Sequence, residues 1–201
     1  MYASPKPKIT TLEVNMNLPN KITILRVCLI PAFLVVFLVR PFSIEWINAY
    51  ASVLLFAIAA ITDAVDGYLA RRYKLVTNFG KLMDPLADKL LVCAALVAFT
   101  YVDALPAWAV IVLISREFYI SGLRQLALEA RVVLAATSLG KFKTAAQITL
   151  IVYILLPFPF SLLVFDIVIF ALLLITVVLS IWSAADYTWK NKHQLFTNKE
   201  F

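Results

Sequence analysis

The sequence is poor in charge, glycine, cysteine and histidine. Only 15% of its 201 residues are charged, and it has four glycines, two cysteines and one histidine. Soluble domains carry about 25% charged residues, so a soluble fold of this length would leave too much apolar surface in water. Disorder, a disulfide scaffold and a nucleic-acid-binding domain are excluded for the whole chain, and so is a glycine-rich phosphate loop. Cys28 and Cys93 both lie in apolar runs, which predicts small core residues and neither a disulfide nor a metal pair.

Apolar residues dominate instead, at 63% of the chain with a mean hydropathy of +0.90. A helix needs about 20 apolar residues to cross a bilayer, and no spanning structure other than a helix fits segments of this length. The sequence therefore predicts an all-α integral membrane protein with six transmembrane helices. The predicted spans are 22–39, 46–62, 85–101, 105–121, 144–157 and 160–183.

Basic residues give the orientation of these helices. When the connecting loops are assigned alternately to two sides, all 18 Lys and Arg residues except Arg40 fall on one side. Cytoplasmic loops carry the excess of Lys and Arg, so both termini are expected in the cytoplasm. We expect residues 1–15 to be a polar extension that is disordered or not native. Residues 16–189 are expected to form the six-helix membrane domain, and residues 190–201 a polar cytoplasmic tail. The aromatic belts that flank a membrane are expected at Trp46, Tyr50, Tyr101, Trp108, Trp182, Tyr187 and Trp189.

Four of the 12 acidic residues lie close together at the predicted cytoplasmic ends of the second and third helices. Carboxylates at membrane depth are costly, so they are usually paired, metal-bound or functional. They form two pairs, and the spacing within each pair favours placing both carboxylates on one face of a helix. A short loop between the two helices would bring the two pairs together. Four oxygen ligands suit Mg²⁺ or Mn²⁺ rather than zinc, which prefers His and Cys. The four residues are Asp63, Asp66, Asp84 and Asp88.

Two divalent ions would neutralise the four carboxylates, and the neighbouring Arg and Lys residues would then leave a positive site that suits a diphosphate. Small residues at 67, 70 and 80 would let a bulky substrate approach the backbone, although small residues also serve helix packing. An ion-coupled transport site and a structural cap network are the alternatives for the Asp cluster. Because of Pro85, the third helix is expected to start near 81–84 or to be kinked there.

These residues also complete a specific pattern, D-x2-D-G-x2-A-R-x8-G-x3-D-x3-D. In this pattern and in its predicted topology, the chain resembles the CDP-alcohol phosphatidyltransferases, over roughly residues 17–185. The positions that fill the pattern are Asp63, Asp66, Gly67, Ala70, Arg71, Gly80, Asp84 and Asp88.

The resemblance implies that the four Asp residues hold two divalent cations, Mg²⁺ or Mn²⁺, and that Asp88 is also the general base on the acceptor hydroxyl. It implies that the diphosphate of CDP-diacylglycerol bridges the metals, and that the protein is a homodimer. Residues 19–26 resemble the entry to the first helix in this family, although a helix cap would look similar. The residues implied for the CDP-lipid are Asn20, Thr23, Gly67, Ala70, Arg71, Thr77 and Gly80.

Between 116 and 147 the chain reads R-E-F, then S-G-L-R, then G-K-x-K-T-x-x-Q. This run resembles the branch of the family whose acceptor is sn-glycerol 3-phosphate, because basic residues at helix ends suit a second phosphate, although the positive-inside rule also accounts for them. The residues that the resemblance assigns to the acceptor phosphate are Arg116, Arg124, Lys141, Lys143 and Thr144.

The implied function is transfer of the phosphatidyl group of CDP-diacylglycerol to sn-glycerol 3-phosphate, giving phosphatidylglycerophosphate and CMP. Its expected place is the bacterial cytoplasmic membrane, with the active site facing the cytoplasm and no nucleic-acid partner. The open alternatives are another acceptor such as inositol phosphate or serine, a membrane prenyltransferase, and a cation transporter. Asp166, in the sixth segment, has no assigned role.

Overall fold

The computed structural model describes residues 18–73, 78–129, 138–157 and 162–196, and within helices it describes the side chains of 25–62, 89–127, 138–155 and 164–192. Over these ranges the protein is helical without a strand, which confirms the predicted all-α class. The elements are α1 (Leu18–Leu34), a π-helical turn η1 (Val35–Val39), α2 (Glu45–Tyr73), α3 (Asn78–Tyr101), α4 (Ala107–Glu129), α5 (Ser138–Leu155) and α6 (Leu162–Phe196).

Each predicted apolar segment lies largely within one helix, but most helices extend beyond it. α6 continues to Phe196, so much of the predicted polar tail is helical. α3 begins at Asn78, ahead of the predicted start near 81–84, and runs on through position 85. A proline removes only one backbone hydrogen bond, which the rest of a long helix can absorb. The polar residues that flank each apolar segment thus belong to the same helix and include its charged residues.

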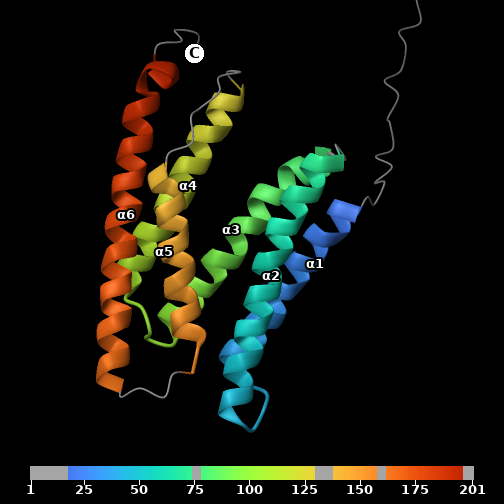
Figure 1. The fold of residues 1–201 in the computed structure, drawn as a ribbon, viewed down its shortest axis with the longest axis vertical. Helices are drawn as coiled ribbons and strands as arrows, with labels where there is room; N and C mark the ends of the chain where they lie inside the picture. The colour runs from blue at the N-terminus through green and yellow to red at the C-terminus, as the bar shows by residue number, and fades with distance from the viewer. Residues whose placement is uncertain (1–17, 74–77, 130–137, 158–161, 197–201) are drawn as a thin grey trace, which may run out of the picture.

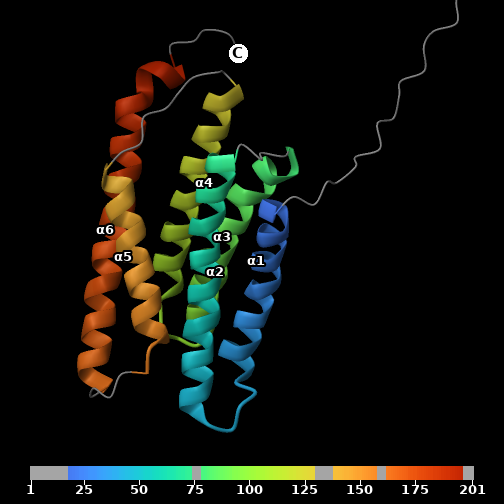
Figure 2. The ribbon, with the colours of Figure 1, turned by 45° about the vertical axis from the view of Figure 1, so that its right-hand side comes forward.

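The helices form two groups of three (Figures 1 and 2). In the first group α1 packs against both α2 and α3, and in the second α6 packs against α4 and α5. Contacts between α3 and α4 and between α2 and α5 join the groups. In Figure 1, α3 leans from the first group towards the foot of α4. The two groups therefore meet most closely at the end where α3 turns into α4.

One continuous apolar core connects both groups. Phe33 of α1 packs on Phe56 of α2 with ring centroids 5.9 Å apart, and Phe37 meets the ring of Phe99 on α3 edge-on at 5.4 Å. Such tilted and edge-on pairs add stability beyond the apolar area that they bury. The core continues into the second group through Leu113, Leu150, Ile151 and Leu173, which are also fully buried.

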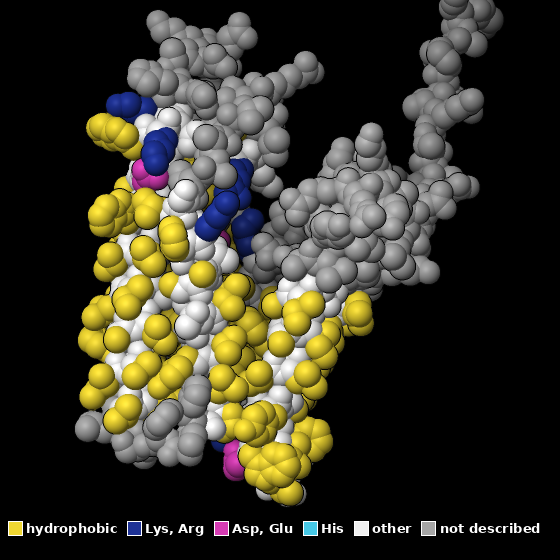
Figure 3. All heavy atoms as spheres, viewed as in Figure 1, with side chains coloured by type: hydrophobic (Ala, Val, Ile, Leu, Met, Phe, Trp, Pro, Cys, Tyr) yellow, Lys and Arg dark blue, Asp and Glu magenta, His cyan; other side chains and the backbone are white. Residues whose placement is uncertain are grey.

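The outer surface is also apolar, as the broad field of hydrophobic side chains in Figure 3 shows. Large apolar patches on an exterior mark contact with a membrane or a partner. Two helical stretches, Glu45–Thr62 and Val164–Lys192, are long and apolar enough to cross a membrane, and Leu25–Val39 and Lys89–Tyr101 are shorter apolar stretches. These features suit a membrane protein, and the number of spans and their orientation stay predictions.

Two residues lie on faces other than those expected. Cys28 on α1 is exposed rather than a core residue. Tyr187 on α6 is buried rather than part of an aromatic belt, whereas the indoles of Trp182 and Trp189 are exposed. A helix that is apolar on all sides gives no sequence signal for which side meets its neighbours.

Candidate functional site

The four Asp residues lie at two matching levels on neighbouring helices. Asp66 on α2 and Asp84 on α3 are each about 10 Å along the helix from the ends at Tyr73 and Asn78, at 1.5 Å per residue. Asp63 and Asp88 are each about 15 Å from the same ends. Because the two helices contact one another and run in opposite directions, each carboxylate-bearing position on α2 has a counterpart on α3 (Figure 1).

This donor set fits divalent cations, because carboxylate oxygens are the ligands that Mg²⁺ and Mn²⁺ prefer. The fit rests on residue type and register, since the side chains of these four residues lie outside the described ones. Among the side chains that the structure does describe, no group of three or more His, Cys, Asp and Glu residues forms a metal site. The side chains of Asn20, Thr23, Ala70 and Arg71, the surroundings of Gly67 and Gly80, and all of Thr77 also lie outside the described part.

A buried ionic network lies in the second group of helices. Its centre is the carboxylate of Glu117 on α4, where Oε1 pairs with Nη1 of Arg116 at 3.2 Å and with Nζ of Lys143 on α5. Lys143 is only 1% exposed and also donates a hydrogen bond to the side-chain oxygen of Gln147, one turn further along α5. A buried charge is tolerated only when it is paired and hydrogen-bonded, and this ammonium meets both conditions.

The network extends to α6 through Arg116. Its Nη2 donates to the hydroxyl of Ser183 at 2.9 Å, and that hydroxyl donates to the backbone carbonyl of Ser180 at 3.0 Å. Within the described part of the structure, two buried donors here lack an acceptor, Nε of Arg116 and the amide nitrogen of Gln147. Buried donors without acceptors are costly, and a water or an anion between α4 and α5 would supply the missing acceptors.

The network lies beside α3, the helix that carries Asp84 and Asp88. Cys93 is about 8 Å along this helix from Asp88. The Lys143 ammonium is also close enough to the Cys93 thiol on α3 to interact with it electrostatically. Figure 3 shows basic side chains gathered where the outline of the molecule is notched between the two groups of helices.

The structure thus brings together two of the five residues predicted for the acceptor phosphate. Arg116 and Lys143 share one carboxylate, whereas the guanidinium carbon of Arg124 lies 5.6 Å from the ring centre of Tyr187. Thr144 is exposed and donates to the Gly140 carbonyl of its own helix, and Lys141 is exposed. The candidate site is therefore formed by the buried Lys143 and the partly buried Arg116.

Three members of the network had no role in the sequence-based prediction. Glu117 and Gln147 lie in the run between 116 and 147 that resembles a branch of the family, but the resemblance assigns no role to either. The i,i+4 spacing of Gln147 from Lys143 is a weak sequence signal that the two side chains interact. The position of Glu117 next to an arginine is a similarly weak signal of an ion pair. Ser183 has no sequence signal, because it contacts Arg116 across 67 positions of the chain.

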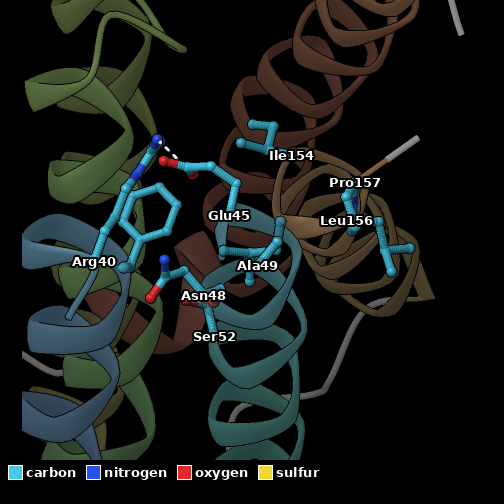
Figure 4. A pocket seen from close by; sticks show the side chains of 10 residues that line it. Arg40, Glu45, Asn48, Ala49, Ser52, Ile154, Leu156 and Pro157 are labelled. Atoms are coloured by element: carbon cyan, nitrogen blue, oxygen red, sulfur yellow. Dashed lines mark hydrogen bonds and ion pairs between the residues drawn. The ribbon is translucent and has the colours of Figure 1, made fainter. Parts of the chain in front are cut away.

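A small polar cavity lies at the opposite end of the bundle, lined by η1, the start of α2 and the end of α5 (Figure 4). Its volume is about 140 Å³, and an ion pair between Arg40 and Glu45 at 3.1 Å lies at its edge. Asn48 spans the turn before α2: its side-chain oxygen accepts from the Phe42 amide, and its nitrogen donates to the Phe42 carbonyl at 2.7 Å. The cavity is about 16 Å or more along α2 from the first Asp pair, too far to share its chemistry.

Comparison with known proteins shows the family of the chain. The sequence profile of the CDP-alcohol phosphatidyltransferases matches residues 16–182. The chain belongs to this family. A Bacillus subtilis (strain 168) protein named CDP-diacylglycerol–glycerol-3-phosphate 3-phosphatidyltransferase is 46% identical over 194 residues, covering 90% of this chain and 98% of the relative.

Two further relatives carry the same name. The Haemophilus influenzae protein is 38% identical over 192 residues, which cover 92% of this chain and 98% of the relative. The Shigella flexneri protein is 36% identical over 180 residues, which cover 87% of this chain and 94% of the relative. The chain is thus a phosphatidyltransferase, and the similarity extends over nearly the full length of its relatives.

Proposed function

We propose that this phosphatidyltransferase joins CDP-diacylglycerol and sn-glycerol 3-phosphate, giving phosphatidylglycerophosphate and CMP. The observation that carries the choice of acceptor is that Arg116 and the buried Lys143 meet at one carboxylate beside α3, the helix that carries Asp88. The names of the relatives support the same pair of substrates. An acceptor with its own phosphate needs a second cationic site, whereas serine does not.

The Asp positions define the reacting centre. Asp63, Asp66, Asp84 and Asp88 hold two divalent cations, Mg²⁺ or Mn²⁺, which when bound supply charge stabilisation to the diphosphate of the CDP-lipid. The remaining residues assigned from the family pattern bind this donor: Asn20, Thr23, Gly67, Ala70, Arg71, Thr77 and Gly80.

Asp88 accepts the proton of the acceptor hydroxyl while the hydroxyl oxygen bonds to the β-phosphorus. The bond from that phosphorus to the bridging oxygen breaks, and CMP leaves with the electron pair. An aspartate has an ordinary pKa near 3.9, so it is a weak base for an alcohol and acts as proton loss accompanies the attack. Arg116 and Lys143 bind the acceptor phosphate and thereby orient the hydroxyl, and Arg124, Lys141 and Thr144 line the approach.

We place the protein in the bacterial cytoplasmic membrane as a homodimer with six spans and both termini in the cytoplasm. The apolar exterior and the two long apolar helices support a membrane location. In this arrangement the lipid tails of the donor remain in the bilayer, while nucleotide and acceptor reach the site from the cytoplasm.

The test is CMP release by the purified protein with CDP-diacylglycerol and, in separate reactions, sn-glycerol 3-phosphate, inositol phosphate and serine. We expect release that depends on sn-glycerol 3-phosphate and the product phosphatidylglycerophosphate by mass spectrometry. Release with inositol phosphate or serine, and none with sn-glycerol 3-phosphate, would refute the proposed acceptor. Absence of release with all three would refute the proposed reaction.

A further inference from the structure

We propose that Glu117 is the positioning residue of the acceptor-phosphate site, where it holds Arg116 and Lys143 as one cationic pair. This inference rests on the proposed function, because it assumes that these two cations bind the phosphate of the acceptor. Glu117 itself does not contact the acceptor, since a carboxylate repels a phosphate.

One carboxylate oxygen brings the two cations together. Oε1 of Glu117 pairs with Nη1 of Arg116 and with Nζ of Lys143, so the guanidinium and the ammonium converge on the same atom from α4 and α5. Like charges held this close in a buried site repel one another strongly. The negative charge of Glu117 offsets that repulsion, and without it the two side chains would separate.

Each cation also has a second, uncharged anchor. Gln147 accepts from Lys143, and Ser183 accepts from Nη2 of Arg116 at 2.9 Å. Each cation is therefore fixed by two contacts, which sets its direction as well as its position. Nε of Arg116 and the amide nitrogen of Gln147 are buried with no acceptor in the described part of the structure.

The charge balance favours a phosphate monoester as the anion. Among the described residues, the two cations and one carboxylate of the network carry a net charge of +1, while a phosphate monoester carries about −1.5 to −2 near neutral pH. Binding of such an acceptor is thus attractive overall. A neutral acceptor gains nothing from the pair, so the same carboxylate that orders the cations also preserves selectivity for a phosphorylated alcohol.

The test compares Glu117→Gln and Glu117→Asp with the wild type. We expect Glu117→Gln to raise the KM for sn-glycerol 3-phosphate about tenfold or more, the effect of losing one charge-assisted contact. The inhibition constant of inorganic phosphate as a competitor should rise in parallel. The KM for CDP-diacylglycerol should stay unchanged and kcat within about threefold, because Asp63 and Asp88 are on other helices. Glu117→Asp keeps the charge and should lie between the other two.

Asp186→Asn is the matched control. Asp186 forms an i,i+4 ion pair with the exposed Lys190 on α6, so its loss removes an acidic residue but no buried pair. This variant should leave both KM values unchanged. If Glu117→Gln does not fold, Glu117→Asp alone carries the test through its KM for the acceptor.

Three results would overturn the inference. The first is an unchanged KM for the acceptor. The second is a lowered KM for the acceptor, which would make Glu117 a competitor of the phosphate. The third is a fall in kcat while both KM values stay constant. If the wild type releases CMP with sn-glycerol 3-phosphate and the Glu117 variants match it, only this inference fails. If the wild type shows no such release, the proposed function fails and takes this inference with it.

Discussion

Arg116 of α4 donates a hydrogen bond from Nη2 to the hydroxyl oxygen of Ser183 on α6, at 2.9 Å and across 67 positions of the sequence. This bond connects the ionic network on α4 and α5 to the last helix. It also fixes the second end of a guanidinium whose first end is held by Glu117. The orientation of this arginine is therefore decided by two helices together.

Replacing Ser183 by alanine should raise the KM for sn-glycerol 3-phosphate severalfold, because Nη2 of Arg116 loses its acceptor. Losing such a bond costs about 1–3 kcal/mol. The measurement is CMP release as a function of acceptor concentration. Ser180→Ala is the control, since its buried hydroxyl donates to no group in the described part of the structure. Equal effects of the two substitutions would argue against a specific role for the Arg116 contact.

Replacing Asn48 by alanine should destabilise the protein by about 1–3 kcal/mol without changing the KM of either substrate. Asn48 is buried, and its side chain satisfies both backbone groups of Phe42 in the turn before α2. Thermal unfolding in detergent measures the loss. Glu45→Gln, which breaks only an exposed ion pair with Arg40, should cost less than about 1 kcal/mol. Similar losses in both variants would contradict this account of the turn.

Removing divalent cations with a chelator should abolish CMP release, and adding Mg²⁺ or Mn²⁺ should restore it. The expectation follows from four carboxylates at two matching levels on α2 and α3. Calcium, a larger ion with looser geometry, is the informative comparison in the same titration. Full activity in the presence of the chelator would rule out the metal-dependent reaction.

Replacing Asp88 by asparagine should abolish turnover while leaving CDP-diacylglycerol binding largely intact, because the other three Asp residues and the lipid contacts remain. Turnover is measured as CMP release and binding with a labelled CDP-lipid. A variant that loses its folded state, with no separate kinetic effect, would favour a structural role for Asp88 instead.

The proposed orientation can be tested with single cysteines in a Cys28→Ser, Cys93→Ser background. Tyr101 and Trp189 are both strongly exposed, at 78% and 72%, near opposite ends of the molecule. In intact bacteria, a maleimide that does not cross membranes should label the Tyr101→Cys variant. It should label the Trp189→Cys variant only after the cells are opened. The reverse pattern would place the termini on the outside.

The sequence by itself determined the helical class, the approximate positions of six helices and the presence of two Asp pairs near the facing ends of the second and third helices. Apolar runs without charge can form only helices in a membrane, and the rise of a helix converts residue number directly into depth. The family pattern around the Asp residues needs only local spacing, so it is visible without any structure.

The tertiary structure decided which faces of these helices meet. Cys28 is exposed although it lies in an apolar run, and Tyr187 is buried although it lies in the polar end of α6. It also decided which of five candidate side chains form a buried site, because the contacts of Lys143 with Glu117 and of Arg116 with Ser183 join separate helices. A charged side chain becomes a buried binding group only where its neighbours supply paired charges and hydrogen bonds, and those neighbours come together only when the helices pack.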